Sequence, residues 1–363
     1  MLKKLRTLAK AMLAVTRVRR SYEAANQAFL EVFGSNRLLA HIGFTLFPVA
    51  FNREQAAVLR GRRNYYRQKQ TGRRSHVELR RNIHRLEKGL IMMPRRDVFA
   101  GDYITETIEF FEVAAAQYAA DPGSIDTGEI RWAHDVLVEY FKACTGSLPA
   151  VDDARARFDE IDFPDPFTDK VPYNKTSEGH STITYEQLAA LTKQRRSVRF
   201  FDERPVPRDD IDRALELARQ APTACNRLPY EFRIFDDPEM VRTVADLPFG
   251  AVGYSHQIPT IVVVVGKLDS YFSPRDRHAI YVDASLATMT FVYALETLGL
   301  SSTLINWPDF EPLERAMQRT LGLDLAERVV MLVAVGYAHP EANVPYSEKK
   351  ELDTFRRYNV LRG

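Results

Sequence analysis

The chain has little cysteine, and this excludes several kinds of structure. Only two cysteines, Cys144 and Cys225, occur in 363 residues, and no CxxC pair is present. A disulfide framework and a cysteine-based zinc site are therefore excluded, and a reducing compartment fits best. The eight histidines are scattered without the spacing of metal ligands, so we expect no metal site.

Short signatures of nucleotide binding and of hydrolysis are also absent. The sequence contains no GxGxxG and no GxxxxGK followed by Ser or Thr, so it predicts neither a Rossmann dinucleotide site nor a P-loop. It contains neither GxSxG nor HExxH, so a serine-hydrolase elbow and a zinc-protease helix are not expected.

No hydrophobic run is long enough to cross a membrane. The longest apolar stretch, residues 38–51, contains His41 and Pro48 and falls short of the roughly 20 residues that a spanning helix needs. The basic residues 1–20 lack the apolar run and cleavage site of a secretory signal. We therefore expect a cytoplasmic protein, with peripheral contact to a membrane as an alternative.

The net charge of +2 conceals a strong asymmetry along the chain. Residues 1–100 carry 22 Lys and Arg against 6 Asp and Glu, whereas residues 101–180 carry 6 against 17. The basic region has three candidate partners: an anionic membrane surface, the chain's own acidic stretch, and nucleic acid. Tyr65 and Tyr66 lie among the basic residues, but no nucleic-acid motif is present, so nucleic acid is the option we favour least.

The pattern of apolar residues divides the chain near residue 180. Residues 1–180 read as mostly helical, but periodicity is lost over 149–184, where four prolines lie among many aspartates. That segment is predicted to be a linker, or to be draped over a partner surface. In residues 181–363 helices and strands alternate. The predicted helices are 185–194, 207–220, 278–298 and 311–321, and the predicted strands are 230–235, 258–266, 302–306 and 328–337.

An arginine-rich segment is the strongest chemical signal. Residues 195–201 are predicted to be extended, so Arg195, Ser197 and Arg199 point one way while Val198 and Phe200 point the other. Two guanidiniums that flank a hydroxyl suit a phosphate, because arginine donates paired, charge-assisted hydrogen bonds. The alternative is a solvated basic strand edge.

A second segment, residues 221–230, reads APTACNRLPY and joins a helix to a strand. Its prolines, small residues and Asn226 make a shaped, polar-lined loop, and an amide that donates and accepts suits a heterocycle. An ordinary helix-to-strand connection is the alternative. Cys225 is best read as a small buried thiol.

Together the two segments resemble the nitroreductase family of FMN-dependent oxidoreductases. The order of RRSVR, a helix, APxxxN and apolar strands carries the resemblance over about residues 185–360. It implies an α+β fold with a mixed sheet sandwiched by helices in residues 181–363, preceded by a mostly α-helical domain in residues 1–180. It also implies FMN as cofactor, NAD(P)H as electron donor, a small-molecule acceptor and a homodimer.

The resemblance further implies which residues contact the cofactor. In that family the first motif grips the FMN phosphate and ribityl chain, the loop reaches the flavin of the other subunit, a strand lies beside the isoalloxazine ring, and a late basic stretch returns to the phosphate. The flavin carries the electrons, so no catalytic side chain is named. The corresponding residues are Arg195, Arg196, Ser197 and Arg199; Pro222, Thr223, Ala224 and Asn226; Ile305 and Asn306; and Lys349 and Lys350.

Two positions depart from the family pattern and leave the reaction open. Leu228 stands where the family often has Gln, and Tyr230 where it often has Trp. Other chemistries on a flavin fold are alternatives: dehalogenation, oxidation of a pathway intermediate, or breakdown of the flavin. A membrane-peripheral scaffold with a vestigial flavin domain is the alternative from another class.

The basic region contains one further predicted helix. Residues 80–90 are predicted to be helical and to end at Gly89, with an apolar stripe on one face. The helix is either structural, which we favour, or a lid that delivers His84 or Arg85 to the flavin pocket.

Overall fold

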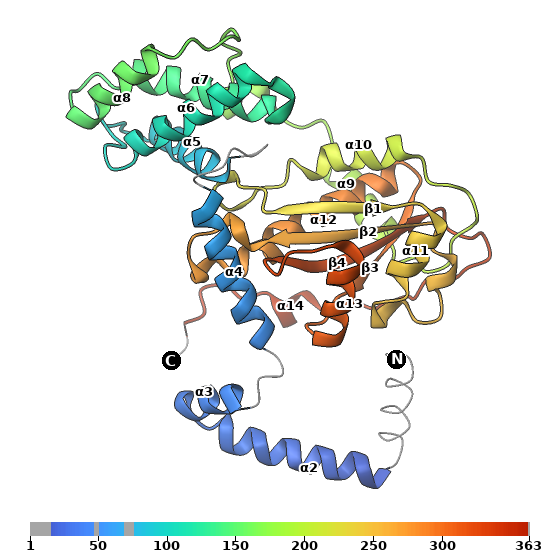
Figure 1. The fold of residues 1–363 in the computed structure, drawn as a ribbon. Helices are drawn as coiled ribbons and strands as arrows, with labels where there is room; N and C mark the ends of the chain where they lie inside the picture. The colour runs from blue at the N-terminus through green and yellow to red at the C-terminus, as the bar shows by residue number, and fades with distance from the viewer. Residues whose placement is uncertain (1–15, 47–50, 69–75, 362–363) are drawn as a thin grey trace.

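The computed structural model describes residues 16–46, 51–68 and 76–361. A four-stranded antiparallel sheet forms the centre of the C-terminal half, with helices on both of its faces (Figure 1). Across the sheet the strands follow the order β1 (Tyr230–Phe235), β2 (Thr260–Lys267), β4 (Glu327–Gly336) and β3 (Ser301–Asn306).

Strand β2 owes its central place to its composition. Every residue from Thr260 to Gly266 is buried, as a continuous β-branched run predicts. Successive side chains enter opposite layers, so Val263 packs in one hydrophobic cluster and Val264 in the other. The sheet is therefore the shared wall of two apolar cores.

Different helices cover the two faces. Helices α10 (Arg208–Ala218) and α12 (Ala279–Thr297) contribute to one core, while α11 (Pro238–Ala245) and α13 (Glu311–Leu321) contribute to the other. Helix α12 ends at Thr297, and Gly299 follows two residues later with a φ of 76°, the left-handed conformation that favours glycine just after a helix. The predicted α+β fold is confirmed. Among the described residues, the parallel pairing in the sheet is a single bridge between Ser197 and Ser302.

Four helices of the N-terminal half enclose a core of their own. Its fully buried side chains include Ile83, Phe111 and Val136. Figure 1 shows this helical group above one end of the sheet. The group consists of α5 (Val77–Leu90), α6 (Ile104–Ala120), α7 (Thr127–Ala143) and α8 (Pro149–Asp159).

Helix α4 (Asn52–Gln68) packs on the C-terminal half instead. Its Ala57 is buried in one cluster with Tyr271 and Ile280. Arg53 donates to Glu311 at 2.7 Å, and Arg60 pairs with Asp324 at 3.1 Å. Basic residues of the first hundred thus pair with the sheet half, and Arg80 and Arg85 also pair with Glu129 and Asp102 of the acidic stretch 101–180.

Helices α2 (Thr16–Phe33) and α3 (Arg37–Leu46) form a hairpin. In Figure 1 this hairpin lies apart from the sheet and from the helical group α5–α8. They meet where Gly43 approaches the ring of Phe33 so closely that a Cβ would lie 2.9 Å from it. Within the described ranges no helix combines the length and the low charge needed to cross a bilayer.

Two expectations about helices are wrong. Residues 149–159 form helix α8, although the segment was expected to be a linker. Pro149 occupies the first turn, where a proline stabilises a helix, and Val151 and Ala154 are buried. Gly89 does not end α5, which runs to Leu90; an added Cβ there would lie 2.2 Å from the ring of Phe99. Gly89 makes room for that ring.

The segment after α8 is draped over helix α7. Buried Asp135 accepts hydrogen bonds from the backbone N–H groups of Thr168 and Lys170, both at 3.0 Å, and from the Thr168 hydroxyl at 2.7 Å. Burial alone would raise the pKa of Asp135, but these hydrogen bonds outweigh it and hold the pKa below its usual value.

We expect Asp135→Asn to lower the free energy of unfolding by about 1–3 kcal/mol at pH 7, because an amide cannot replace a charged acceptor of three hydrogen bonds. The folded pKa is depressed, so the stabilisation is present above the unfolded pKa near 4 and is lost as the pH falls through the folded pKa. Urea unfolding at pH 7 and pH 3, with Glu139→Gln on the same helix as control, measures this. An equal loss at both pH values would contradict it.

Candidate functional site

The arginine motif lies along the outer edge of the sheet. Residues 195–201 are extended and join the sheet through two isolated bridges, from Ser197 to Ser302 and from Phe201 to Ala338. The Val198 N–H donates to the Ser302 carbonyl at 3.0 Å. Because β3 is an edge strand, the motif occupies the side of β3 that faces away from β4.

The expected alternation within the motif is wrong at one residue. Val198 and Phe201 are buried, whereas Phe200 is 46% exposed and does not share the core face with Val198. The segment makes two separate bridges rather than a continuous ladder, so nothing enforces a strict period of two between them.

The three arginines of the motif have different surroundings. Arg196 donates to the backbone carbonyls of Pro345, at 3.0 Å, and Tyr346, which brings the C-terminal segment against the motif. Arg199 lies beside Tyr254, and burial raises the pKa of that phenol although the guanidinium opposes the shift. Within the described part of the chain, Arg195 makes no side-chain hydrogen bond and no ion pair.

Strand β3 presents an exposed strip beside the motif. Leu304 is 38% exposed and Asn306 is also exposed, whereas Ile305 between them is buried in a core cluster. Only the backbone of Ile305 is therefore available to a ligand. The Ser302 hydroxyl is buried and has no hydrogen-bond partner among the described residues. Lys349 and Lys350 are exposed in the C-terminal segment that Arg196 contacts.

The second predicted segment forms a strained loop. Cys225, Asn226 and Leu228 have φ values of 56°, 51° and 47°, in the left-handed region that costs a non-glycine residue about 1–3 kcal/mol. Pro222 and Ala224 are exposed on it. Such a conformation persists only when surrounding contacts hold it.

Three hydrogen bonds that involve side chains hold the loop, in addition to the backbone bond from the Asn226 N–H to the Thr223 carbonyl at 3.0 Å. The Ala224 N–H donates to Asp283 at 2.9 Å, and the Leu228 N–H donates to the Thr223 hydroxyl at 3.1 Å. The Asn226 carbonyl accepts from Nε of Arg80 on helix α5, also at 2.9 Å. Helix α5 therefore contacts the loop through Arg80, while His84 pairs with Glu87 and Arg85 with Asp102 inside the helical group.

A buried polar cluster lies beneath the loop. Asp283 accepts from the Tyr271 hydroxyl at 3.1 Å, and burial raises the pKa of Asp283 although both hydrogen bonds oppose the shift. The Arg227 guanidinium lies 4.8 Å from the centre of the Tyr271 ring. Burial, with Asp283 nearby, raises the pKa of Tyr230 to about 12, and its hydroxyl has no hydrogen-bond partner in the part of the chain that the structure describes.

The loop and the arginine motif lie far apart within one chain. The loop leads into Tyr230, which pairs with Gly266 at one end of β2. Ser197 bridges Ser302 of β3, and Ser302 pairs with Val335 of β4. Val335 in turn pairs with Thr260, which lies at the other end of β2. Gly266 and Thr260 are separated by about 20 Å of strand, and β1 and β3 are opposite edges of the sheet. One chain therefore does not bring the two motifs together.

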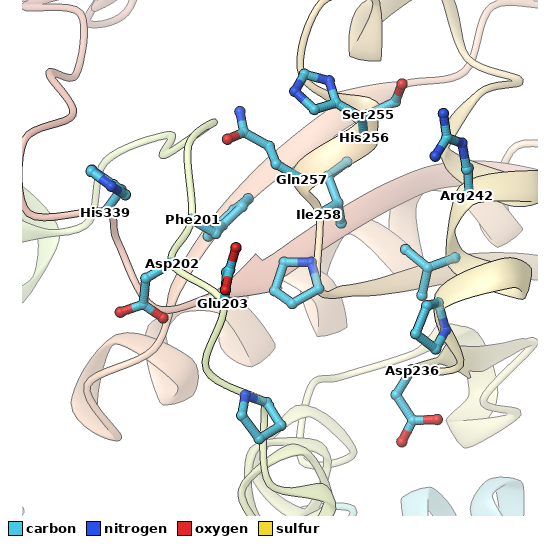
Figure 2. A pocket seen from close by; sticks show the side chains of 14 residues that line it. Phe201, Asp202, Glu203, Asp236, Arg242, Ser255, His256, Gln257, Ile258 and His339 are labelled. Carbon is cyan, nitrogen blue, oxygen red and sulfur yellow. The ribbon is translucent and has the colours of Figure 1, made fainter.

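A hollow of about 920 Å³ opens beyond the far end of the motif. Figure 2 shows Phe201, Gln257 and Ile258 at its walls, with charged groups such as Asp202 and Arg242 around them. A hollow of about 490 Å³ adjoins it and shares Gln257 and His339. Neither of these two hollows is lined by residues 195–199 or by the loop.

Sequence reasoning missed two residues of this region. Asp283 carried a signal, because it is the one acidic residue in the first seventeen positions of the apolar helix 279–297. A lone carboxylate in such a helix is expected to have a buried partner. Arg80 carried no such signal in the sequence, because it is one of many arginines in the basic region.

The C-terminal half of the chain matches the nitroreductase family. The match to that family model covers residues 192–255 and 253–337. The predicted nitroreductase-family domain, preceded by additional N-terminal residues, is confirmed.

Curated relatives match the same half. An Archaeoglobus fulgidus protein, assigned by name as an NADH dehydrogenase/NAD(P)H nitroreductase, is 27% identical over 175 residues, which cover 48% of this chain and 94% of that protein. Human iodotyrosine deiodinase 1 is 24% identical over 209 residues, which cover 50% of this chain and 71% of that protein.

Solved structures are similar over the same share of the chain. An FMN-dependent nitroreductase from Clostridium difficile has 19% identity and a TM-score of 0.42, with 48% of this chain and 99% of that chain covered. A Parabacteroides distasonis protein, assigned by name as an NADH dehydrogenase/NAD(P)H nitroreductase, has 23% identity and a TM-score of 0.43. The match covers 48% of this chain and 99% of that chain.

The two tyrosines beneath the loop allow a matched test. We expect Tyr230→Phe to leave the free energy of unfolding unchanged or to raise it by up to about 2 kcal/mol, because it removes a buried hydroxyl without a partner. Tyr271→Phe should lower it by about 1–2 kcal/mol, because Asp283 loses a donor. Urea unfolding at pH 7 measures both. Equal destabilisation by the two variants would show that the Tyr230 hydroxyl is bonded.

Proposed function

We propose that the protein is an FMN-dependent oxidoreductase of nitroreductase type, which passes electrons from NAD(P)H through FMN to a small-molecule acceptor. One observation carries the proposal. Within the region that matches the family, Arg195 has no partner among the described residues and lies where the motif meets the open edge of β3. An unpaired guanidinium at a strand edge suits a phosphate.

The residues present fit FMN. Arg195 and Ser197 would hold the phosphate, joined by Lys349 and Lys350 of the C-terminal segment that Arg196 contacts at Pro345 and Tyr346. The strip of β3 from Ser302 to Asn306 spans about 13 Å and would lie along the rest of the molecule. The orphaned Ser302 hydroxyl is a further polar group at the phosphate end.

The chain's own residues would bind and orient rather than react. When bound, the flavin supplies the electron or hydride transfer. The guanidiniums of the motif favour negative charge at their end of the site, and the outward-facing N–H groups of an edge strand offer donors to a heterocycle. The relative from Archaeoglobus fulgidus, by its name, supports NAD(P)H as the donor.

A homodimer completes the site in this proposal. The loop that carries Pro222, Thr223, Ala224 and Asn226 lies at the sheet edge opposite to the arginine motif. In a twofold dimer the loop of one protomer would approach the motif of its partner, and two equivalent sites would form.

Dehalogenation is the second candidate reaction, and the match to human iodotyrosine deiodinase 1 favours it. The two reactions differ in acceptor: a nitroarene or quinone for the first, a halogenated phenol for the second. Oxidation of NAD(P)H in the presence of each acceptor, with the FMN-loaded protein, distinguishes them.

We expect Arg195→Gln to weaken FMN binding at least about tenfold, because it removes a charged donor from the phosphate. Quenching of flavin fluorescence on titration measures the dissociation constant. Lys193→Gln, an exposed residue two positions earlier, is the control and should bind like the wild type. A wild-type protein that takes up no FMN would overturn the proposed function.

We also propose that α2 and α3 contact an anionic membrane surface. Leu38, Ile42 and Leu46 follow one face of α3 and are 69%, 39% and 64% exposed. Residues 1–46 carry eight Lys and Arg against two Asp and Glu. An exposed apolar face within a strongly basic segment suits anionic headgroups.

Sedimentation with lipid vesicles tests this contact. The full chain should pellet with phosphatidylserine-containing vesicles and remain in solution with pure phosphatidylcholine. Leu38→Gln with Ile42→Gln should reduce the bound fraction at least about tenfold, because two exposed apolar groups that would enter the membrane are lost. Thr45→Gln on the same helix is the control. If the double variant binds equally, or instead dissociates an oligomer, the membrane contact is refuted.

A further inference from the structure

The strained loop depends on a contact from outside the family domain. Two of the three side chains that anchor it, Asp283 and Thr223, belong to the C-terminal half, but the third is Arg80 of helix α5. Arg80 binds the carbonyl of Asn226, in the middle of the run of left-handed residues. It therefore fixes the carbonyl of the left-handed Asn226, next to Cys225 and close to Leu228.

Arg80 is itself held rigidly. Its Nη1 donates to Glu129 at 2.9 Å, and the side chain of Glu129 is only 1% exposed. Glu129 also accepts from the backbone N–H of His76 at 2.7 Å, and the Arg80 guanidinium lies 5.5 Å from the centre of the Trp132 ring. The planar guanidinium group of Arg80 thus links the helical group α5–α8 to the loop.

This arrangement is additional to what the chain shares with the Archaeoglobus fulgidus protein. The match to the Archaeoglobus fulgidus protein uses 48% of this chain and already accounts for 94% of that protein. Almost no length remains there for a group of helices such as α5–α8. The contact from Arg80 is therefore a property of the added half of this chain.

We propose that Arg80 is a positioning residue for the candidate flavin loop, through which the helical group α5–α8 sets the affinity of the site for FMN. The inference rests on the proposed function. Arg80 does not reach a ligand itself; it fixes the Asn226 peptide and with it the exposed face of Ala224 and Pro222. The added helices are in this sense part of the site.

The test needs variants that leave no buried charge unpaired. Arg80→Gln combined with Glu129→Gln removes both charges and keeps amides that can still bond each other. Arg80→Lys keeps the positive charge but replaces the fork with a single ammonium group. Lys88→Gln, exposed on the same helix, is the control for loss of one charge.

The first readout needs no cofactor. Hydrogen exchange of the apo-protein should show faster exchange of the Ala224 and Leu228 amides in the double variant, with the amides of β2 unchanged. Circular dichroism should show that the helices of both variants remain folded. Unchanged loop exchange in the double variant would overturn the positioning role.

The second readout is FMN affinity by fluorescence titration. Both the double variant and Arg80→Lys should bind about tenfold more weakly than the wild type, the effect of one lost hydrogen bond from a charged donor. If Arg80→Lys binds like the wild type, the effect is one of charge and positioning is refuted. A wild-type protein that binds no FMN refutes the proposed function, whereas variants that match a binding wild type refute only this inference.

Discussion

The candidate site depends on the open edge of strand β3. The sheet order places β3 last, so its outer side has a bridge to Ser197 and, among the described residues, no full strand partner. Edge strands present unpaired N–H and C=O groups, which proteins cover or use. Here the chain lays its arginine motif along that edge and brings the C-terminal segment against it through Arg196. Polar backbone and guanidinium groups are thereby concentrated on one border of the molecule.

The opposite border carries the second constraint, a loop in a costly conformation. Left-handed residues between Cys225 and Leu228 are kept in place by Asp283, by Thr223 and by Arg80. The buried sheet separates the two borders by about 20 Å along β2. A ligand that requires both borders must therefore lie between two chains, which ties the proposed cofactor to the proposed dimer.

Much of the C-terminal fold could be predicted because its signals are local. The run from Thr260 to Val265 is too apolar and too β-branched for any place but the centre of the sheet, and helix 185–194 was predicted with the bounds observed. The two motifs could be located for the same reason, since each is a contiguous segment. Whether they bind a cofactor stays a prediction.

The remaining features could not be predicted because they depend on distant contacts. Pro149 was read as a loop signal, yet it begins a helix whose apolar side chains are buried by α6 and α7. Phe200 is exposed because its segment bridges two different places rather than one strand. The contact of Arg80 with Asn226 joins residues 146 positions apart, and no pattern within either segment indicates it.

A crystal structure of the protein grown with FMN tests the central claim most directly. The account predicts a flavin at a subunit boundary, with its phosphate on Arg195 and Ser197 of one protomer and its ring contacted by the loop 222–226 of the partner. A flavin bound within a single protomer, for example in the hollow beside Phe201 and His339, would contradict the account.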